Sequence, residues 1–217
     1  MWWERRGFIK VVVARMGRSH ERKALRKEWS ESLLRILTVS KDTKTVRTEM
    51  AKNGEVILMS VKGEKYHATV ERLIRKLSKK KVLYVSYNRT CDAWRESCAK
   101  KKLVAKNTFF VDAVSSSVLR SPAPGANCAF VSSPGALTEL AIIISEALKG
   151  GFEYLVFDSL TALAVHATSD ELVSFVANTI ARLHDRNVNG IFFVMKSTPY
   201  ARWLEQVKGL VDKIVEK

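Results

Sequence analysis

The sequence predicts an α/β domain of three layers, with a mostly parallel β-sheet between two layers of helices. Several short segments are apolar throughout instead of alternating with polar residues, which is typical of strands that are buried on both faces. These segments alternate with stretches of helical periodicity, as in parallel sheets with crossover helices. The chain of 217 residues is 47% hydrophobic and 27% charged, so it can bury a sizeable core.

The strands are expected wherever a short run of β-branched, aromatic and aliphatic residues ends at a polar or turn-forming residue. The first such run, EVILMSV, is followed by Lys-Gly, and a later run, YLVFD, ends in Asp158. In chain order the expected strands are Glu55–Val61, Val82–Tyr87, Thr108–Val114, Cys128–Ser133, Tyr154–Asp158, Gly190–Met195 and Leu210–Glu216.

The helices are expected between these strands. Apolar residues spaced by three or four mark the first of them, Gly150-Gly151 ends the middle one, and Ser169 is the expected N-cap of the longest one. The Ser-, Pro- and Gly-rich stretch over 115–127 is predicted to be a loop. The expected helices are Lys65–Lys81, Cys91–Leu103, Thr138–Leu148, Ser169–Asn187 and one around Tyr200–Lys208.

Residues 1–53 do not share this rhythm, so we interpret them as a basic extension of the α/β domain at 54–217. A basic helix is expected around 19–37, and partial disorder of the extension is left open. Residues 1–53 carry a net charge of +8 and residues 54–106 a net charge of +9, whereas residues 107–217 carry −2. Such asymmetry favours an acidic partner, with a solvated lysine-rich face as the alternative.

The three cysteines are odd in number and lack CxxC spacing, so neither a disulfide framework nor a zinc site is expected. Reduced thiols favour a cytoplasmic protein. No apolar window approaches the roughly 18 residues that a membrane span needs, and no export signal is recognised. The histidines lack partners at metal-binding spacing; they are His20, His67, His166 and His184. No metal site is predicted.

Ligands of parallel sheets bind outside the carboxyl ends of the strands, so the residues just after each strand are the candidates. Two of these strand ends, VLYVSYN and YLVFDSLTAL, resemble the RecA/KaiC/RadA family of ATPase domains. The resemblance runs from about Gly54 to Glu216. It is strongest to archaeal KaiC/RAD55-type homologues that have lost the Walker A P-loop, through the segments Cys128–Leu148 and Gly150–Leu160. It implies a RecA-like fold in which Asp158, followed by Ser159, takes the place of the Walker B aspartate.

The other catalytic positions of that family depart from its pattern. The phosphate loop GxxxxGK[ST] is absent, and the strand that should lead into it continues as MSVKGEKYHATV. The degenerate phosphate-loop position therefore falls on Lys62, Gly63, Lys65 and Thr69. The family glutamate position falls on Tyr87 and Asn88, neither of which is a carboxylate base. With two of three catalytic components missing, ATP hydrolysis is not expected.

Asp158 then has a structural alternative to metal binding. A carboxylate at the end of a strand can accept hydrogen bonds from the following loop, here from Ser159 and Thr161. Lys196 ends a later strand at the same sheet edge, so a Lys196–Asp158 ion pair in place of the lost cation is a second hypothesis. No cofactor is expected, although weak binding of Mg-ATP stays open.

The leading hypothesis is a degenerate, non-hydrolysing RecA/KaiC-like domain that acts as a regulatory or protein-interaction module, with a protein partner or as a homo-oligomer. The resemblance adds an archaeal setting linked to signalling. One alternative is a nucleic-acid-binding protein that uses the basic first half. Another is an unorthodox ATP-binding protein or ATPase that retains Asp158. The basic patch comprises Arg72, Arg75, Lys76, Lys79, Lys80, Lys81, Lys100, Lys101 and Lys102.

Overall fold

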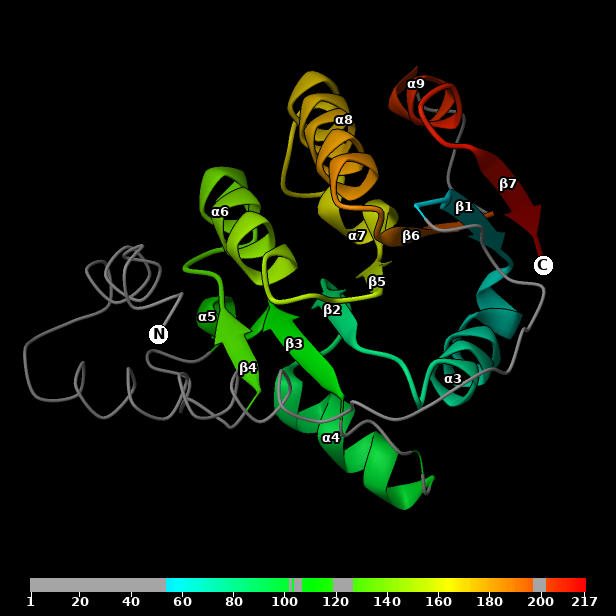
Figure 1. The fold of residues 1–217 in the computed structure, drawn as a ribbon, viewed down its shortest axis with the longest axis vertical. Helices are drawn as coiled ribbons and strands as arrows, with labels where there is room; N and C mark the ends of the chain where they lie inside the picture. The colour runs from blue at the N-terminus through cyan, green and yellow to red at the C-terminus, as the bar shows by residue number, and fades with distance from the viewer. Residues whose placement is uncertain (1–53, 102, 104–106, 119–126, 197–201) are drawn as a thin grey trace, which may run out of the picture.

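The computed structural model describes residues 54–101, 103, 107–118, 127–196 and 202–217 (Figure 1). Its centre is a seven-stranded sheet with the order β4-β3-β2-β5-β6-β1-β7, in which every neighbouring pair is parallel. The strands are β1 (Val56–Val61), β2 (Val82–Ser86), β3 (Thr108–Asp112), β4 (Cys128–Phe130), β5 (Tyr154–Asp158), β6 (Asn189–Met195) and β7 (Lys213–Glu216).

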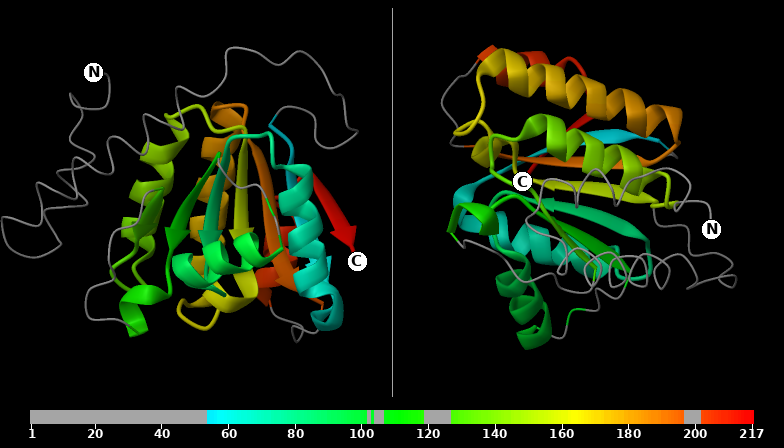
Figure 2. Two further views of the ribbon diagram at one scale, coloured as in Figure 1. Left: turned by 90° about the horizontal axis from the view of Figure 1, so that it is seen from below. Right: turned by 90° about the vertical axis from the view of Figure 1, so that its left-hand side faces the viewer.

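Helices cover both faces of the sheet, so the predicted three-layer α/β class is confirmed (Figures 1 and 2). The helix pair α3 (Tyr66–Lys76) and α4 (Cys91–Lys100) lies on one face. The helices α6 (Leu137–Leu148), α8 (Ser169–Asp185) and α9 (Arg202–Lys208) lie on the other. Three short elements complete the described chain: the 3-10 turn η2 (Gly63–Lys65), α5 (Ser115–Val118) and α7 (Leu160–Leu163).

The strands are apolar throughout because they bury side chains on both sides of the sheet. Phe109 and Phe110 are neighbours in β3, yet Phe109 belongs to the core beneath α6 and α8 and Phe110 to the core beneath α3 and α4. Phe192 and Phe193 of β6 divide in the same way. All four are at most 1% exposed, so each strand contributes to two hydrophobic cores, as in other parallel sheets.

Three local expectations are corrected by the structure. The first helix starts at Tyr66 and ends at Lys76, because residues 77–80 form turns in which Lys80 N–H donates to the carbonyl of Leu77 at 2.9 Å. The predicted loop at 115–127 opens with the single helical turn α5. A further helical turn, α7, follows Asp158 directly and was not predicted.

The N-cap of α8 is Thr168 and not the predicted Ser169. The Thr168 hydroxyl accepts the N–H of Glu171 at 3.4 Å, and the Glu171 carboxylate accepts the N–H of Thr168 at 2.9 Å. Such a capping box requires a Glu or Gln three residues after the cap. Thr168 meets this requirement with Glu171, whereas Ser169 would place Leu172 there.

α6 ends at Leu148, just before the Gly150-Gly151 pair that was expected to stop it, and Gly151 adopts the left-handed φ of +76°. Among the described residues, no helix is long and apolar enough to cross a membrane. The expected basic helix at 19–37, His20, Lys102 and the start of the helix around Tyr200 lie outside the described residues.

Candidate functional site

Asp158 is the last residue of β5 and lies at the carboxyl end of the sheet. In the strand register it pairs with Ser86, the last residue of β2, and Ser86 pairs in turn with Asp112, the last residue of β3. Asp158 is 1% exposed, and the peptide bond that joins it to Ser159 is cis. The predicted aspartate is therefore a buried residue at the edge where ligands of parallel sheets bind.

Three neutral side chains donate hydrogen bonds to the Asp158 carboxylate. The Tyr66 hydroxyl and the Asn88 amide donate to Oδ1, and the Tyr84 hydroxyl donates to Oδ2. The Asn88 nitrogen also lies 3.1 Å from the Tyr66 hydroxyl and 3.3 Å from Oγ of Ser159. Both oxygens of the carboxylate are thus engaged by neutral donors, and none of the ion pairs between described residues includes Asp158.

Each donor is positioned by a different element of the fold. The turn η2 connects β1 directly to α3, so Tyr66 begins this helix next to the end of β5. Tyr84 occupies the middle of β2 and stacks on Phe110, with 5.4 Å between ring centroids. Asn88 lies in the short connection between β2 and α4. Because β2 neighbours β5 in the sheet, Tyr84 and Asn88 reach Asp158 from the same side.

The two tyrosines remain protonated donors in the folded protein. Burial raises the pKa of Tyr66, and the adjacent Asp158 charge raises it further. The same two causes, in the same order, raise the pKa of Tyr84. The rings also pack tightly: Tyr66 meets Phe193 edge-on at 5.7 Å between centroids. The chemistry available here is neutral hydrogen bonding to a fixed carboxylate.

The expected phosphate-loop residues do not converge on Asp158. Lys62, Gly63 and Lys65 are exposed around η2. The Thr69 hydroxyl donates to the carbonyl of Lys65 at 2.9 Å, one helical turn earlier. Of the predicted site residues, the structure therefore joins Asp158, Ser159 and Asn88 and leaves the phosphate-loop positions apart from them.

Three expected partners of Asp158 bind elsewhere. The Lys196–Asp158 ion pair is wrong, because Nζ of Lys196 pairs with the Glu216 carboxylate at 2.5 Å on the neighbouring part of the sheet. Ser159 caps α7, accepting the N–H of Ala162 at 3.3 Å, and Thr161 accepts the N–H of Met195 at 2.9 Å. Asp158 is held by its hydrogen-bond donors on α3, β2 and the β2–α4 connection instead.

The sequence reasoning missed Tyr66 and Tyr84. One signal was available for Tyr66: it follows the short Lys-Gly-Glu-Lys connection at the position where the first helix of the fold begins. Tyr84 offered only its alternation with Ser86, which places the two side chains on one face of β2. The partnership of either tyrosine with Asp158 depends on strand order, which hydrophobic periodicity does not contain.

A second carboxylate, Asp112, ends the adjacent strand β3 and is fully buried. It accepts the N–H of Cys91 at 2.6 Å, the N–H groups of Val114 and Ser115 at 2.8 Å each, and the Ser115 hydroxyl at 2.7 Å. These bonds tie the start of α4 and the turn α5 to the sheet. Asp112 is therefore saturated by structural donors and is not available as a ligand.

The thiols and histidines do not form a reactive centre in the described part of the chain. Cys91, Cys98 and Cys128 are buried free thiols, and burial raises the pKa of Cys98 to about 11. Of the described histidines, His67 contacts Arg89, His166 packs near the ring of Tyr87 and His184 pairs with Asp212 at 3.1 Å. No group of three or more His, Cys, Asp or Glu residues within the described ranges could hold a metal ion.

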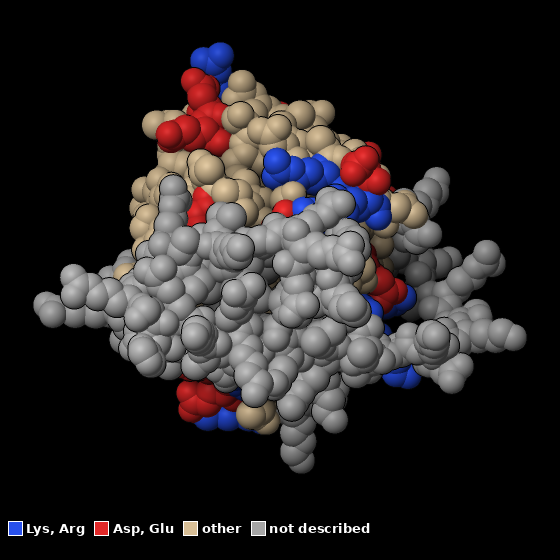
Figure 3. All heavy atoms as spheres, turned by 60° about the vertical axis from the view of Figure 1, so that its left-hand side comes forward, with Lys and Arg blue, Asp and Glu red and all other residues tan. Residues whose placement is uncertain are grey.

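The predicted basic patch is partly neutralised by acids. Lys80 pairs with Glu153 at 2.7 Å, Lys100 pairs with Glu96 at 2.7 Å, and Lys101 pairs with Glu71. On the described surface visible in Figure 3, basic and acidic side chains lie next to one another. Arg75 donates to the carbonyl of Lys101, at 3.2 Å. Arg72 and Lys76 instead line a cavity on the α3 side of the sheet.

Comparison with solved structures supports the fold. The KaiC-like protein PH0186 from the hyperthermophilic archaeon Pyrococcus horikoshii OT3 matches with a TM-score of 0.55 and 12% sequence identity, over 76% of this chain and 71% of that one. At this identity the likeness concerns the fold alone. No curated protein matches the chain. One family model, described as "Family of unknown function (DUF7504)", matches residues 56–217, and the chain therefore belongs to that family.

Proposed function

We propose that this protein is a non-hydrolysing RecA-like domain that acts as a regulatory or protein-interaction module. The observation that carries the proposal is the environment of Asp158. Its two carboxylate oxygens accept hydrogen bonds from Tyr66, Tyr84 and Asn88, where an ATPase would need this aspartate to hold a magnesium ion.

Magnesium binding at this position would require the carboxylate to exchange these donors for a cation. Mg²⁺ demands near-octahedral oxygen geometry at about 2.0–2.1 Å and usually shares its shell with phosphate oxygens. Tyr66 and Tyr84 are 6% and 1% exposed, and both are packed against other aromatic rings. Rotating them away would break these contacts, so the hydrogen-bonded arrangement competes directly with metal binding.

The residues around Asp158 also lack the parts that would hold and activate a nucleotide. Lys62 and Lys65 are exposed, and no Gly-Lys-Ser/Thr sequence occurs in the chain. Asn88 occupies the family glutamate position and donates to Asp158, so it is not a base. From the resemblance of the sequence to KaiC/RAD55-type domains, the proposal adds an archaeal, cytoplasmic setting linked to signalling or regulation, with a protein partner or self-association.

The ATPase part of the proposal is tested by measuring phosphate release from Mg-ATP with the full chain, beside the variants Asp158→Asn and Asp185→Asn. Asp185 is exposed at the end of α8 and serves as the matched control. The proposal predicts no release above the buffer rate for any of the three proteins. Release that persists in Asp185→Asn and is lost in Asp158→Asn would contradict it.

A further inference from the structure

A cavity of about 190 Å³ lies between α3 and the edge strand β7, on the face of the sheet that carries α3 and α4. Its apolar lining consists of aliphatic side chains and a thioether: Ile57, Met59, Leu73, Ile191 and Val215. We call this cavity the aliphatic trough. Ile57 and Leu73 are largely buried, while Met59 and Val215 are partly exposed, so the trough opens to solvent.

Cations flank the aliphatic trough on two sides. Arg72 and Lys76 are one helical turn apart on α3. On the side of β7, Lys213, Val215 and Lys217 are spaced by two residues and therefore face the trough together; Lys217 directly follows the strand. Among the residues that the structure describes, no acidic one lines the trough. Of the ion pairs between described residues, none uses Arg72, Lys213 or Lys217. The site therefore offers an apolar floor between two rows of positive charge.

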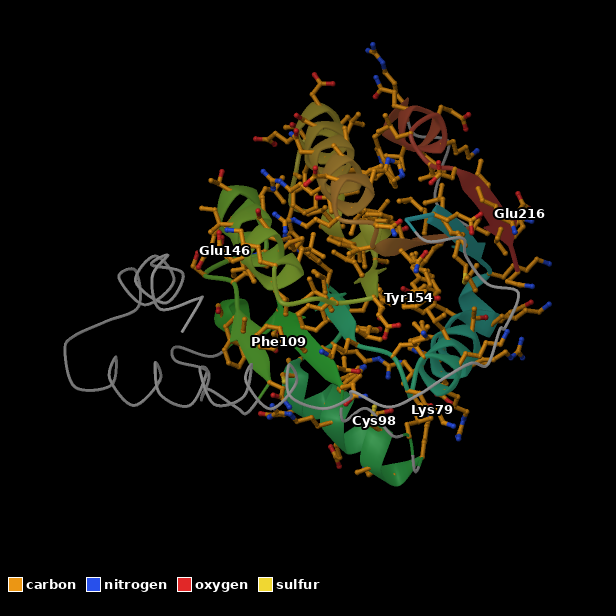
Figure 4. The ribbon with its side chains drawn as sticks, viewed as in Figure 1. Lys79, Cys98, Phe109, Glu146, Tyr154 and Glu216 are labelled. Atoms are coloured by element: carbon orange, nitrogen blue, oxygen red, sulfur yellow. The ribbon has the colours of Figure 1, made fainter. Side chains whose placement is uncertain are left out.

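The strand beside the trough also has an open edge. Within the described chain, β7 pairs with β1 alone and lies at the edge of the sheet (Figure 2), so its outer side has no strand partner there. Ile214 is 44% exposed on the face opposite Val215. Glu216, labelled in Figure 4, is neutralised by Lys196. An exposed edge with apolar side chains on both faces favours the addition of another strand.

We propose that the edge of β7 and the aliphatic trough bind an extended acidic segment of a partner protein. The segment pairs with β7 as an additional strand. Every second side chain of the segment faces the trough: aliphatic side chains enter it over Val215, and carboxylates at the neighbouring alternate positions meet Arg72 and Lys213. The proposal deepens the interaction role proposed above by naming the surface and the chemistry of the partner.

Charge and shape favour this occupant over three others. A second copy pairing through β7 would bring its own Lys213 and Lys217 against the same residues, and like charges repel. Residues 1–53 carry a net charge of +8, which is the wrong sign for a cationic trough. The described lining residues include no aromatic ring on which a nucleic-acid base could stack, whereas single-stranded nucleic acid usually binds on such rings.

The probe is a fluorescein-labelled peptide of seven residues, Glu-Thr-Val-Thr-Glu-Thr-Val, in which glutamate and valine alternate on one face of the strand. Its binding to the full chain is followed by fluorescence anisotropy at low salt, and we call it the glutamate–valine peptide. Three labelled control peptides separate the contributions. Serine in place of valine removes the apolar anchors, lysine in place of glutamate reverses the charge, and N-methylation of every main-chain amide blocks strand pairing. We expect only the glutamate–valine peptide to bind well. Absence of binding, or equal binding of the serine or N-methylated peptide, would overturn the proposal.

Two charge-matched double variants locate the site. Arg72→Glu with Lys213→Glu reverses one cation on each side of the trough, and we expect about tenfold weaker binding of the glutamate–valine peptide. Lys79→Glu with Arg186→Glu makes the same charge change at exposed positions that do not line the trough, and less than about a twofold change is expected. Equal weakening by both pairs would show a general electrostatic effect and would contradict a site at the trough.

Hydrogen exchange in the unmodified protein provides an independent measurement, which does not depend on how the variants fold. Addition of the glutamate–valine peptide should slow amide exchange in β7, and unchanged exchange there would count against strand addition. Sedimentation without peptide tests the second copy: a dimer abolished by Arg72→Glu with Lys213→Glu would assign the edge to self-association and refute the proposal. The phosphate-release assay reports on ATPase chemistry alone, so the two proposals can fail separately.

Discussion

The hydroxyl of Tyr66 donates a hydrogen bond to Oδ1 of Asp158, joining the start of α3 to the end of β5 across 92 positions of sequence. Tyr84 donates to the other oxygen of the same carboxylate. The aspartate that resembles a magnesium ligand in the sequence is thus part of a buried hydrogen-bond network. This network connects α3, β2 and β5, and its contribution to stability can be measured directly.

Replacement of Tyr66 by Phe removes one donor and keeps the ring. We expect a loss of about 1–3 kcal/mol in the free energy of unfolding, because Asp158 loses a hydrogen bond in a buried site. Urea unfolding followed by circular dichroism measures this loss. The control is Tyr154→Phe, because Tyr154 begins β5 and so lies at the opposite end of the strand from Asp158; there the change should stay within about 0.5 kcal/mol. Equal effects of the two substitutions would argue against the network.

Replacement of Asp158 by Ala should cost about 3 kcal/mol in the free energy of unfolding, because the buried donors of Tyr66, Tyr84 and Asn88 lose their acceptor. Asp185→Ala, at an exposed position, should have little effect. The same urea titration distinguishes the two accounts of Asp158. A carboxylate that is kept for an absent cation would be a source of strain, so a more stable Asp158→Ala protein would refute the structural role.

Stability should fall above pH 10 in a way that depends on the tyrosines. Burial raises the folded-state pKa of Tyr66 and Tyr84 above the ordinary value of 10.0. Their contribution is therefore complete below pH 10 and is lost as the pH rises towards the folded-state pKa, because only the unfolded chain releases the phenolic protons in that window.

In the variant Tyr66→Phe with Tyr84→Phe, the slope of unfolding free energy against pH should be shallower above pH 10. The expected difference is about 1.4 kcal/mol per pH unit for each tyrosine removed. Urea titrations at several pH values between 8 and 11 measure both slopes. Identical slopes in the variant and the unmodified protein would show that neither phenol is held protonated by the fold.

The capping box of α8 predicts that Thr168→Ala will lower the free energy of unfolding by about 1 kcal/mol. Ser169→Ala, one position later, should change it by less than about 0.5 kcal/mol, since Ser169 is not the cap. Thermal or urea unfolding of the two variants in parallel provides the comparison. The reverse order of effects would restore Ser169 as the N-cap.

The fold was predictable because its determinants are local. A strand such as YLVFD is apolar on both faces, and this pattern alone indicates a buried parallel strand. Because Asp158 ends this apolar run, it was expected at the carboxyl end of the strand, where ligands of parallel sheets bind. The short α7 was missed because a single helical turn contains too few residues for a periodic pattern.

The environment of Asp158 was not predictable in the same way. Tyr66 reaches it only because β1 and β5 are both neighbours of β6, and this strand order is a property of the whole chain. Lys196 was expected to pair with Asp158 because both follow strands at one edge. In the structure, Lys196 pairs with Glu216 instead, which belongs to β7, two strands away from β6 in the sheet.

The most direct test of the central claim is a calorimetric titration of the full chain with Mg-ATP, up to about 1 mM, the upper end of common substrate KM values. If Asp158 is committed to Tyr66, Tyr84 and Asn88, no saturable heat is expected for the unmodified protein or for Asp158→Asn. Saturable binding that disappears in Asp158→Asn and persists in Asp185→Asn would contradict this account and establish Asp158 as a ligand of the metal–nucleotide complex.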